Sequence, residues 1–279
     1  MNIDSDKLVN DIYDCYLQDD VEAPKRKHLG ASALGDKCKR HVYYEFRWYT
    51  TGIKEGRILR LFDTGKREES RVIEDLRKIG FVISMNADNG VQITCRDDSG
   101  HIGGSVDGII HHIPLKYGFL SADKAILEIK THSEKNFRKL KDGGIQKSFP
   151  KHYTQVQVYM GMMEIPMSLY VGVNKNTDEL YFELVPYDRD EHNRAYDVAK
   201  EVVLATQPLD KIKDSPSWFE CKMCKFYDVC HMGASAPKSC RTCVFSRPIA
   251  HGKWTCDFHN KELSHEMQVE GCSDHKENQ

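Results

Sequence analysis

Two short apolar runs that each contain a carboxylate constrain this chain more than any other feature of its sequence. The first run is residues 103–110, which contains Asp107, and the second is residues 125–131, which contains Glu128. Short runs of β-branched and aliphatic residues are typical of largely buried strands. A buried carboxylate is costly unless it is paired or binds a metal ion. The two runs therefore predict neighbouring strands whose acids share a metal site.

The second run also predicts how its side chains are distributed. Residues i and i+2 of a strand share one face, so Glu128 and Lys130 are expected to point the same way. Leu127 and Ile129 then point to the opposite face, into the core. The predicted site therefore has an ammonium group beside the metal ion. The alternative is a structural cluster of buried ions without a metal.

Composition limits the classes of protein to which the chain can belong. Its 279 residues suffice for one large domain with a small appendage, and the net charge of −2 gives no overall attraction to nucleic acid. No apolar run approaches the ~20 residues that span a bilayer, and the N-terminus lacks the features of a signal peptide. We therefore expect a cytoplasmic protein without membrane association. Ten cysteines in such a chain favour metal or redox chemistry over disulfides.

Apolar periodicity predicts an α/β fold with a mixed sheet flanked by helices. The helix over 150–162 would place Gln155 and Tyr159, at i and i+4, on one face. Glu69 lies in the helix over 56–79, where a glutamate is ordinarily exposed.

A charged loop with a hinge at Gly143 and Gly144 is expected after Thr131. The other predicted helices cover 4–20 and 188–207, and the predicted strands cover 81–83, 91–94, 102–110, 125–131, 168–173 and 180–185.

A first group of cysteines has the spacing of metal ligands. Cys221, Cys224 and Cys230 follow the pattern Cys-x2-Cys-x5-Cys, which leaves one position of a tetrahedral set open. Cys38, in a polar and basic loop, is our choice for the fourth ligand. Four thiolates suit either zinc or a [4Fe–4S] cluster. The alternative is a set of unrelated buried thiols.

A second group of cysteines lies in the C-terminal segment, residues 236–279. The longer tail over residues 208–279 is poor in hydrophobic residues and needs another source of stability. The spacing predicts a zinc-binding module in the C-terminal segment, appended to a domain over residues 1–235. We favour four cysteines as its ligands, although either histidine can replace Cys272. The candidate ligands are Cys240, Cys243, Cys256 and Cys272, with His259 and His275 nearby.

Taken together, these motifs resemble the PD-(D/E)XK nuclease superfamily, and within it the RecB-type and lambda-exonuclease-like branch. The resemblance covers roughly residues 28–230. Asp107 matches the first acidic position, residues 128–130 match the E-x-K motif, and Gln155 with Tyr159 matches the Q-x3-Y of the following helix. Glu69 fills the position four residues after a glycine in an earlier helix motif. Cys38 and the cysteine triplet match the layout of the family's iron–sulfur members.

The resemblance implies a restriction-endonuclease-like core and a metal-dependent DNA exonuclease of the kind that tailed phages carry. Asp107 and Glu128, assisted by Glu69 and the carbonyl oxygen of Ile129, would bind Mg²⁺ or Mn²⁺. Lys130 would orient the attacking water and stabilise developing charge. Gln155 and Tyr159 would position DNA or order the site. The resemblance favours a [4Fe–4S] cluster at the first cysteine group, although zinc remains open.

Two functions of different classes follow. The first is a deoxyribonuclease that processes DNA ends in recombination or repair, with DNA, a recombination or single-strand-annealing protein and further copies of the chain as partners. If the chain is phage-encoded, it would act in the host cytoplasm. The second is a non-catalytic DNA-binding or scaffolding protein with a decayed nuclease core. Because Lys130 and the acidic positions are all filled, we favour the first.

Overall fold

The computed structural model describes residues 3–22, 24–50, 55–117 and 124–278. Its helices are α1 (Ser5–Glu22), η1 (Ala31–Ala33), α2 (Lys39–Phe46), α3 (Gly56–Lys78), η2 (Leu115–Tyr117), α4 (Glu134–Ser148), α5 (Pro150–Met163), α6 (Arg189–Leu204), α7 (Phe219–Lys222), α8 (Tyr227–His231), η3 (Cys240–Thr242) and α9 (His265–Glu270). Its strands are β1 (Leu29–Gly30), β2 (Val82–Ser84), β3 (Thr94–Arg96), β4 (Ile102–Ser105), β5 (Gly108–His112), β6 (Ala125–His132), β7 (Met167–Asn174), β8 (Leu180–Pro186), β9 (Ser246–Ile249), β10 (Lys253–Cys256) and β11 (Lys261–Leu263).

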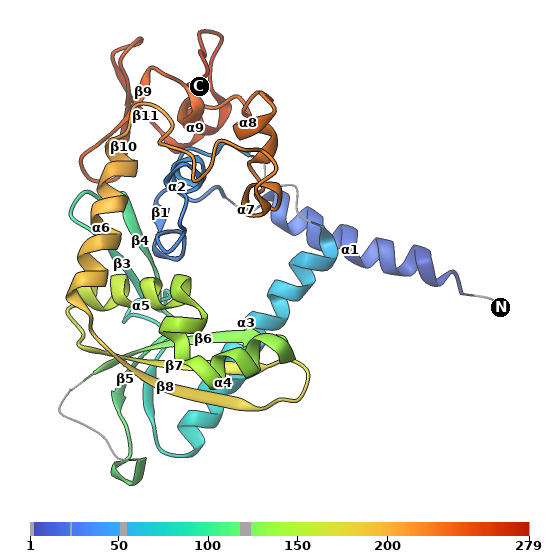
Figure 1. Ribbon diagram of the computed structural model, residues 1–279, viewed down its shortest axis with the longest axis vertical. Coiled ribbons are helices and arrows are strands. Elements are labelled where there is room, and N and C mark those ends of the chain that lie inside the picture. Colours follow the sequence, from blue (N-terminus) through green and yellow to red (C-terminus); the bar gives the residue numbers. More distant parts are fainter. Residues whose placement is uncertain (1–2, 23, 51–54, 118–123, 279) are drawn as a thin grey trace.

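A five-stranded sheet lies in the lower part of the molecule in the view of Figure 1. Its strand order is β2-β5-β6-β7-β8, and only β6 and β7 are parallel to each other. Parallel neighbours need a crossover connection, which α4 and α5 provide between β6 and β7. The predicted fold class, a mixed sheet flanked by helices, is confirmed.

The two faces of β6 have different neighbours. Leu127 and Ile129 lie in a buried apolar cluster with residues of α3, including Ile73. Ile126 belongs to the larger cluster on the opposite face, which includes Val156 of α5. Because alternate residues share a face, Glu128 is directed to the α5 side, as the alternation of the sequence predicts.

A second, three-stranded sheet has the order β1-β4-β3 and corrects one prediction. The apolar run 102–110 is not one strand, because β4 ends at Ser105 and β5 begins at Gly108 in the other sheet. Asp107 therefore lies at the junction between two sheets rather than within a strand. β1 pairs with β4 in parallel, so that Leu29 lies opposite Ile102.

The segment after β6 is helical, so the predicted charged loop is wrong. Residues Glu134–Ser148 form α4, whose buried side includes Phe137, Leu140 and Ile145. The expected glycine hinge is present as a kink at Gly144, where φ is 67°. A positive φ suits glycine, which has no Cβ to clash with the backbone.

The C-terminal segment packs on the preceding described residues of the chain, up to residue 235, which we call the main body (Figure 1). The side chain of Trp254 in β10 is fully buried and belongs to the larger apolar cluster, where its ring lies 5.3 Å from that of Phe46. Two buried arginines, Arg47 and Arg241, lie over the same indole, at 5.0 and 3.8 Å from its centroid. Packing shared with the rest of the chain therefore helps to hold this segment.

Within the part of the chain that the structure describes, no helix has both the length and the apolar character needed to cross a membrane.

Candidate active site

Asp107 connects the two sheets at the site predicted from the sequence. Its Oδ2 accepts a hydrogen bond from the backbone N–H of Ile129 in β6, with an N–O distance of 2.7 Å. The break between β4 and β5 turns the Asp107 side chain toward β6, beside Glu128. The two acids therefore meet, although Asp107 reaches the site from a strand junction.

The carboxylate of Glu128 is held asymmetrically. The side chain is 1% exposed, and its Oε1 accepts hydrogen bonds from Lys130 Nζ and from Gln155 Nε2, the latter over 2.9 Å. Its Oε2 is buried and has no hydrogen-bond partner among the described residues. A buried polar atom without a partner is costly. A cation beside Oε2 would remove that cost, so the arrangement fits a metal ligand.

Burial, together with neighbouring negative charge, raises the pKa of two acids. Burial, followed by the charge of Asp107, raises the pKa of Glu69 in α3 to about 7. Burial also raises the pKa of Glu128 to about 7; Asp107 and Glu69 add to this rise, and Lys130 opposes it. These acids repel one another when all are charged. A divalent cation would relieve this repulsion.

Lys130 remains a cation in this environment. Burial lowers the pKa of Lys130, but the charges of Glu128 and Asp107 outweigh this effect and raise it overall. The side chain is 28% exposed, so the ammonium group is partly accessible to a ligand. It can therefore donate hydrogen bonds to water or to an anionic oxygen.

Two residues of α5 support Glu128 from the side. Gln155 Nε2 donates to Glu128 and also lies 3.2 Å from Tyr159 Oη. The tyrosine ring packs against β4, where a Cβ on Gly104 would lie only 2.6 Å from Tyr159 Oη. Gln155 and Tyr159 therefore lie on one helical face, as predicted. Gln155 bonds to Glu128 directly, and Tyr159 contacts Gln155.

These residues face a cavity of about 540 Å³, which is within the range of small-molecule sites. Its lining combines the acids Asp107 and Glu128 with the cationic side chains of Arg26, Lys130 and Lys151. Glu69 does not line this cavity, and the side chain of Ile129 is buried on the α3 face. The lining residues with charged or polar side chains are Arg26, His28, Ser32, Gln92, Ser105, Asp107, Glu128, Lys130, Lys151, His152, Gln155 and Tyr159.

The first cysteine group converges on another cavity. Cys38, Cys221, Cys224 and Cys230 all line a space of about 520 Å³. Burial and the neighbouring thiols raise the pKa of Cys221. His41, which sequence reasoning missed, lies with Nδ1 3.4 Å from Cys224 Sγ. Its position three residues after Cys38, on the helix that Cys38 begins, is the signal that could have found it.

The cysteines of the C-terminal group also lie together. Burial and the neighbouring Cys272, Cys243 and Cys256 raise the pKa of Cys240 to about 11. All four line a void of about 10 Å³. None of the ten cysteines forms a disulfide in the described chain.

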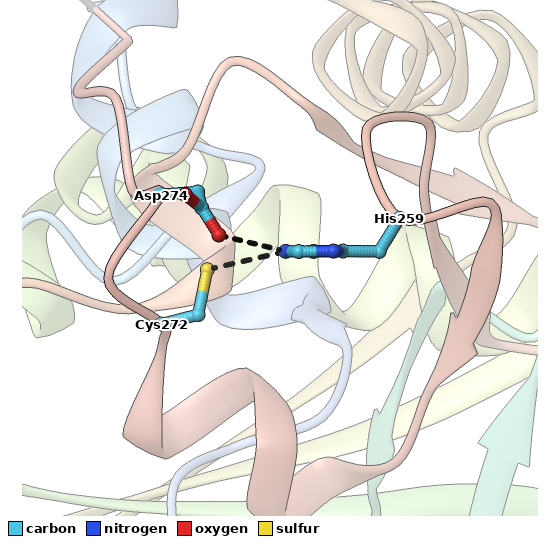
Figure 2. A group of neighbouring side chains, drawn as sticks. All are labelled: His259, Cys272 and Asp274. Carbon is cyan, nitrogen blue, oxygen red and sulfur yellow. Dashed lines mark hydrogen bonds and ion pairs between the residues drawn. The ribbon is translucent and has the colours of Figure 1, made fainter.

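The two histidines near this group differ in their contacts. His275 Nε2 lies 3.1 Å from Thr242 Oγ1. His259 Nε2 lies 3.9 Å from Cys272 Sγ and 3.3 Å from Oδ2 of Asp274, a residue that sequence reasoning missed (Figure 2). Both contacts reach the same ring nitrogen, whereas a catalytic triad uses both nitrogens of its histidine. Converging donors of this kind fit a cation site, and among the described residues only these three form such a compact group.

Comparison with known proteins identifies part of the chain. Residues 78–165 match the family model of the YqaJ-like viral recombinase domain. The resemblance to the lambda-exonuclease-like branch is thereby confirmed over this segment, which contains Asp107, Glu128, Lys130, Gln155 and Tyr159. The match includes no residue of either cysteine group. No match is found among curated protein sequences.

One solved structure shares the fold, and two others are more loosely similar. The crystal structure of SSO0001 is 16% identical and superimposes with a TM-score of 0.52, covering 82% of this chain and 98% of that one. Two crystal structures of LHK-Exo, an alkaline exonuclease from Laribacter hongkongensis, are similar with a TM-score of 0.44 each. The complex with dAMP is 13% identical and covers 63% of this chain and 86% of that one; the other is 14% identical and covers 64% and 89%. The first likeness concerns the fold alone, and the other two are too loose to bear on function.

Proposed function

We propose that this protein is a metal-dependent deoxyribonuclease, an exonuclease that hydrolyses phosphodiester bonds at DNA ends during recombination or repair. The observation that carries the proposal is the meeting of Asp107, Glu128 and Lys130 at one cavity, with Glu128 Oε2 buried and unpartnered among the described residues. The match of residues 78–165 to a viral recombinase domain supports it.

Mg²⁺ or Mn²⁺ fits the donors of this site. Asp107 and Glu128 offer hard oxygen ligands, which these ions prefer, and Glu69 and the carbonyl of Ile129 are proposed as further ligands. The raised pKa values of Glu69 and Glu128 support a cation that offsets their repulsion. A divalent cation would neutralise phosphate charge and activate water for attack.

The protein's own groups have distinct proposed roles. Lys130 would hold the attacking water and donate a hydrogen bond to the phosphate oxygen on which charge develops. Gln155 would keep the Glu128 carboxylate oriented, and Tyr159 would hold the amide of Gln155. Arg26 and Lys151, which line the cavity, would contact DNA phosphates.

The cysteine groups are proposed as separate metal centres. The convergence of Cys38, Cys221, Cys224 and Cys230 supports a [4Fe–4S] cluster, with zinc as the alternative ion. The convergence of Cys240, Cys243, Cys256 and Cys272 supports zinc in residues 236–279, appended to a nuclease domain over residues 1–235. His259 is the proposed substitute ligand, because His275 already bonds to Thr242.

The proposed partners and location follow from this activity. DNA is the substrate, and a recombination or single-strand-annealing protein is a proposed partner, in the cytoplasm of the cell or of a phage host. Further copies of the chain are also proposed partners. In support, α1 and α3 expose apolar side chains, namely Leu8, Val9, Ile12, Leu61 and Phe62.

Degradation of DNA with different ends tests the proposal. Linear duplexes, linear single strands and closed circles are incubated with Mn²⁺ and wild type, Lys130→Ala or Lys78→Ala. Lys78 is an exposed lysine paired with Asp75 and serves as the matched control. We expect linear DNA to be degraded and circles to survive, with Lys130→Ala at least about 100-fold slower and Lys78→Ala unchanged.

Each other outcome has a defined meaning. Cutting of closed circles would contradict exonuclease action but not the nuclease itself. If wild type and Lys130→Ala are equally inactive on every substrate, the nuclease proposal fails. DNA binding without degradation would then support the non-catalytic alternative.

A further inference from the structure

Three consecutive backbone carbonyls near the N-terminus are each held by a side chain from elsewhere in the chain. Lys25 O accepts from His265 Nε2 over 2.9 Å, and Arg26 O accepts from Trp48 Nε1 over 3.0 Å. Lys27 O accepts from Arg241 Nη2 over 2.9 Å. Residues 25–27 have no partner strand to hold these groups, so the three donors fix the path of the segment.

Two of the three donors belong to the C-terminal segment, and one of them is itself rigidly held. The side chain of Arg241 is buried, and its Nε donates to Gln268 Oε1 over 2.6 Å. Its Nη1 lies 3.3 Å from Phe46 O. All of its hydrogen-bond partners within the described ranges are neutral oxygens. A buried guanidinium without a carboxylate partner is costly, and here it serves to bind carbonyl groups of the main body.

The side chains of the same N-terminal segment reach the candidate active site. Arg26 and His28 line the cavity that contains Asp107, Glu128 and Lys130. The segment continues directly into β1, which pairs with β4 shortly before Asp107. Residues 25–28 therefore present backbone carbonyls to the C-terminal segment and the side chains of Arg26 and His28 to the cavity.

We infer that Arg241 and His265 are positioning residues, which hold Arg26 where it contacts a DNA phosphate in the cavity. The C-terminal segment thereby sets how tightly the substrate is held, and the acids and Lys130 set how fast it is cut. The inference rests on the proposed function, since it assumes that the substrate is DNA. It gives the C-terminal segment a task in substrate binding, through hydrogen bonds that need no metal ion.

His265 offers the cleaner test, because it is only partly buried whereas Arg241 lies in the core. We expect His265→Ala to raise KM for linear DNA and Kd for a labelled duplex about three- to tenfold, with kcat within about twofold. It should also reduce the salt dependence of binding by about one phosphate contact. His265→Gln, whose amide can donate to Lys25 O, should restore both constants. Val269→Ala on the same helix is the control.

A double-mutant cycle decides whether His265 acts through Arg26. Arg26→Ala should raise Kd similarly, and the double variant should bind no more weakly than Arg26→Ala alone, because the two changes remove one contact. Additive losses, an unchanged Kd in His265→Ala, or failure of His265→Gln to restore binding would each overturn the inference. A wild type that binds DNA without cutting it contradicts only the proposed exonuclease, because Kd still measures the positioning effect.

Discussion

Asp107 Oδ2 and the backbone N–H of Ile129 are joined by a hydrogen bond of 2.7 Å, and this bond links the end of the β1-β4-β3 sheet to the five-stranded sheet at the candidate active site. Asp107 follows the end of β4, and Ile129 lies in the middle of β6 between Glu128 and Lys130. The bond therefore fixes the position of one acid relative to the other acid and the lysine. Preorganised charges of this kind need no rearrangement when the reaction occurs.

Removing the amide that holds Glu128 should weaken metal binding. Gln155→Ala leaves Glu128 Oε1 with Lys130 as its remaining donor, so the carboxylate can turn away from the cation. We expect Mn²⁺ affinity and cleavage rate to fall about 10- to 100-fold, as measured by calorimetry and by degradation of linear DNA. Gln157→Ala is the control, since Gln157 is buried in the same helix but bonds to Pro186 O. Equal losses in the two variants would show that the effect is only structural.

The stability gained from Mn²⁺ should increase with pH. Glu69 and Glu128 have pKa values raised from 4.5 to about 7 in the folded protein. Acids with raised pKa values contribute stability below their unfolded value and lose it as pH rises through the folded value. The metal-free protein should therefore lose stability between pH 4.5 and about 7, and Mn²⁺ should offset this loss.

Thermal unfolding with and without Mn²⁺ at pH 5.5 and pH 8 measures this effect. The rise in Tm on adding Mn²⁺ should be larger at pH 8, where both acids are charged, and Asp107→Asn should reduce it at both pH values. An equal rise in Tm at the two pH values would count against these carboxylates as the metal ligands.

The packing of the C-terminal segment should be visible in the stability of the whole chain. Trp254 is fully buried against Phe46 and two arginines. We expect Trp254→Ala to lower the free energy of unfolding by about 3–5 kcal/mol, measured by urea denaturation with a probe in the main body. Val269→Ala, at an exposed position of α9, should change it by less than about 1 kcal/mol. An unchanged main-body transition in Trp254→Ala would mean that the segment is an independent unit.

The two cysteine groups should lose their metals independently. Cys224→Ser should abolish iron and the visible absorption of an iron–sulfur cluster while leaving zinc, because Cys224 lines only the first cysteine cavity. Cys256→Ser should have the opposite effect, because it lines only the second. Metal analysis and visible spectra of protein purified without oxygen measure both. A colourless wild type, or loss of both metals in one variant, would contradict the assignment.

The sequence predicted the elements whose periodicity is strong and local. Leu127 and Ile129 alternate with Glu128 and Lys130, so the two faces of β6 were predictable. In α4, by contrast, the many charged residues and two glycines hide the apolar face of Phe137, Leu140 and Ile145. The break at Asp107 was also hidden, because Ile102 and Ile109 read as one apolar run although they lie in different sheets.

Contacts between residues far apart in the sequence could not be predicted from local patterns. The hydrogen bond from Arg241 to Lys27 O joins positions 214 residues apart, and no spacing rule connects them. Composition predicted a poor core for the C-terminal segment because it counts residues within the segment. Trp254 packs instead on Phe46 of the main body. Asp274 could not be predicted for a related reason. Its carboxylate lies beside His259 only because the folded chain brings these two residues together.

Crystals of the protein soaked in Mn²⁺ would show where the ion binds, because anomalous scattering locates it independently of activity. We expect a peak in the cavity within coordination distance of Asp107 and of Glu128 Oε2, absent from Asp107→Asn crystals. Mn²⁺ bound elsewhere, with no peak between these two carboxylates, would contradict this expectation.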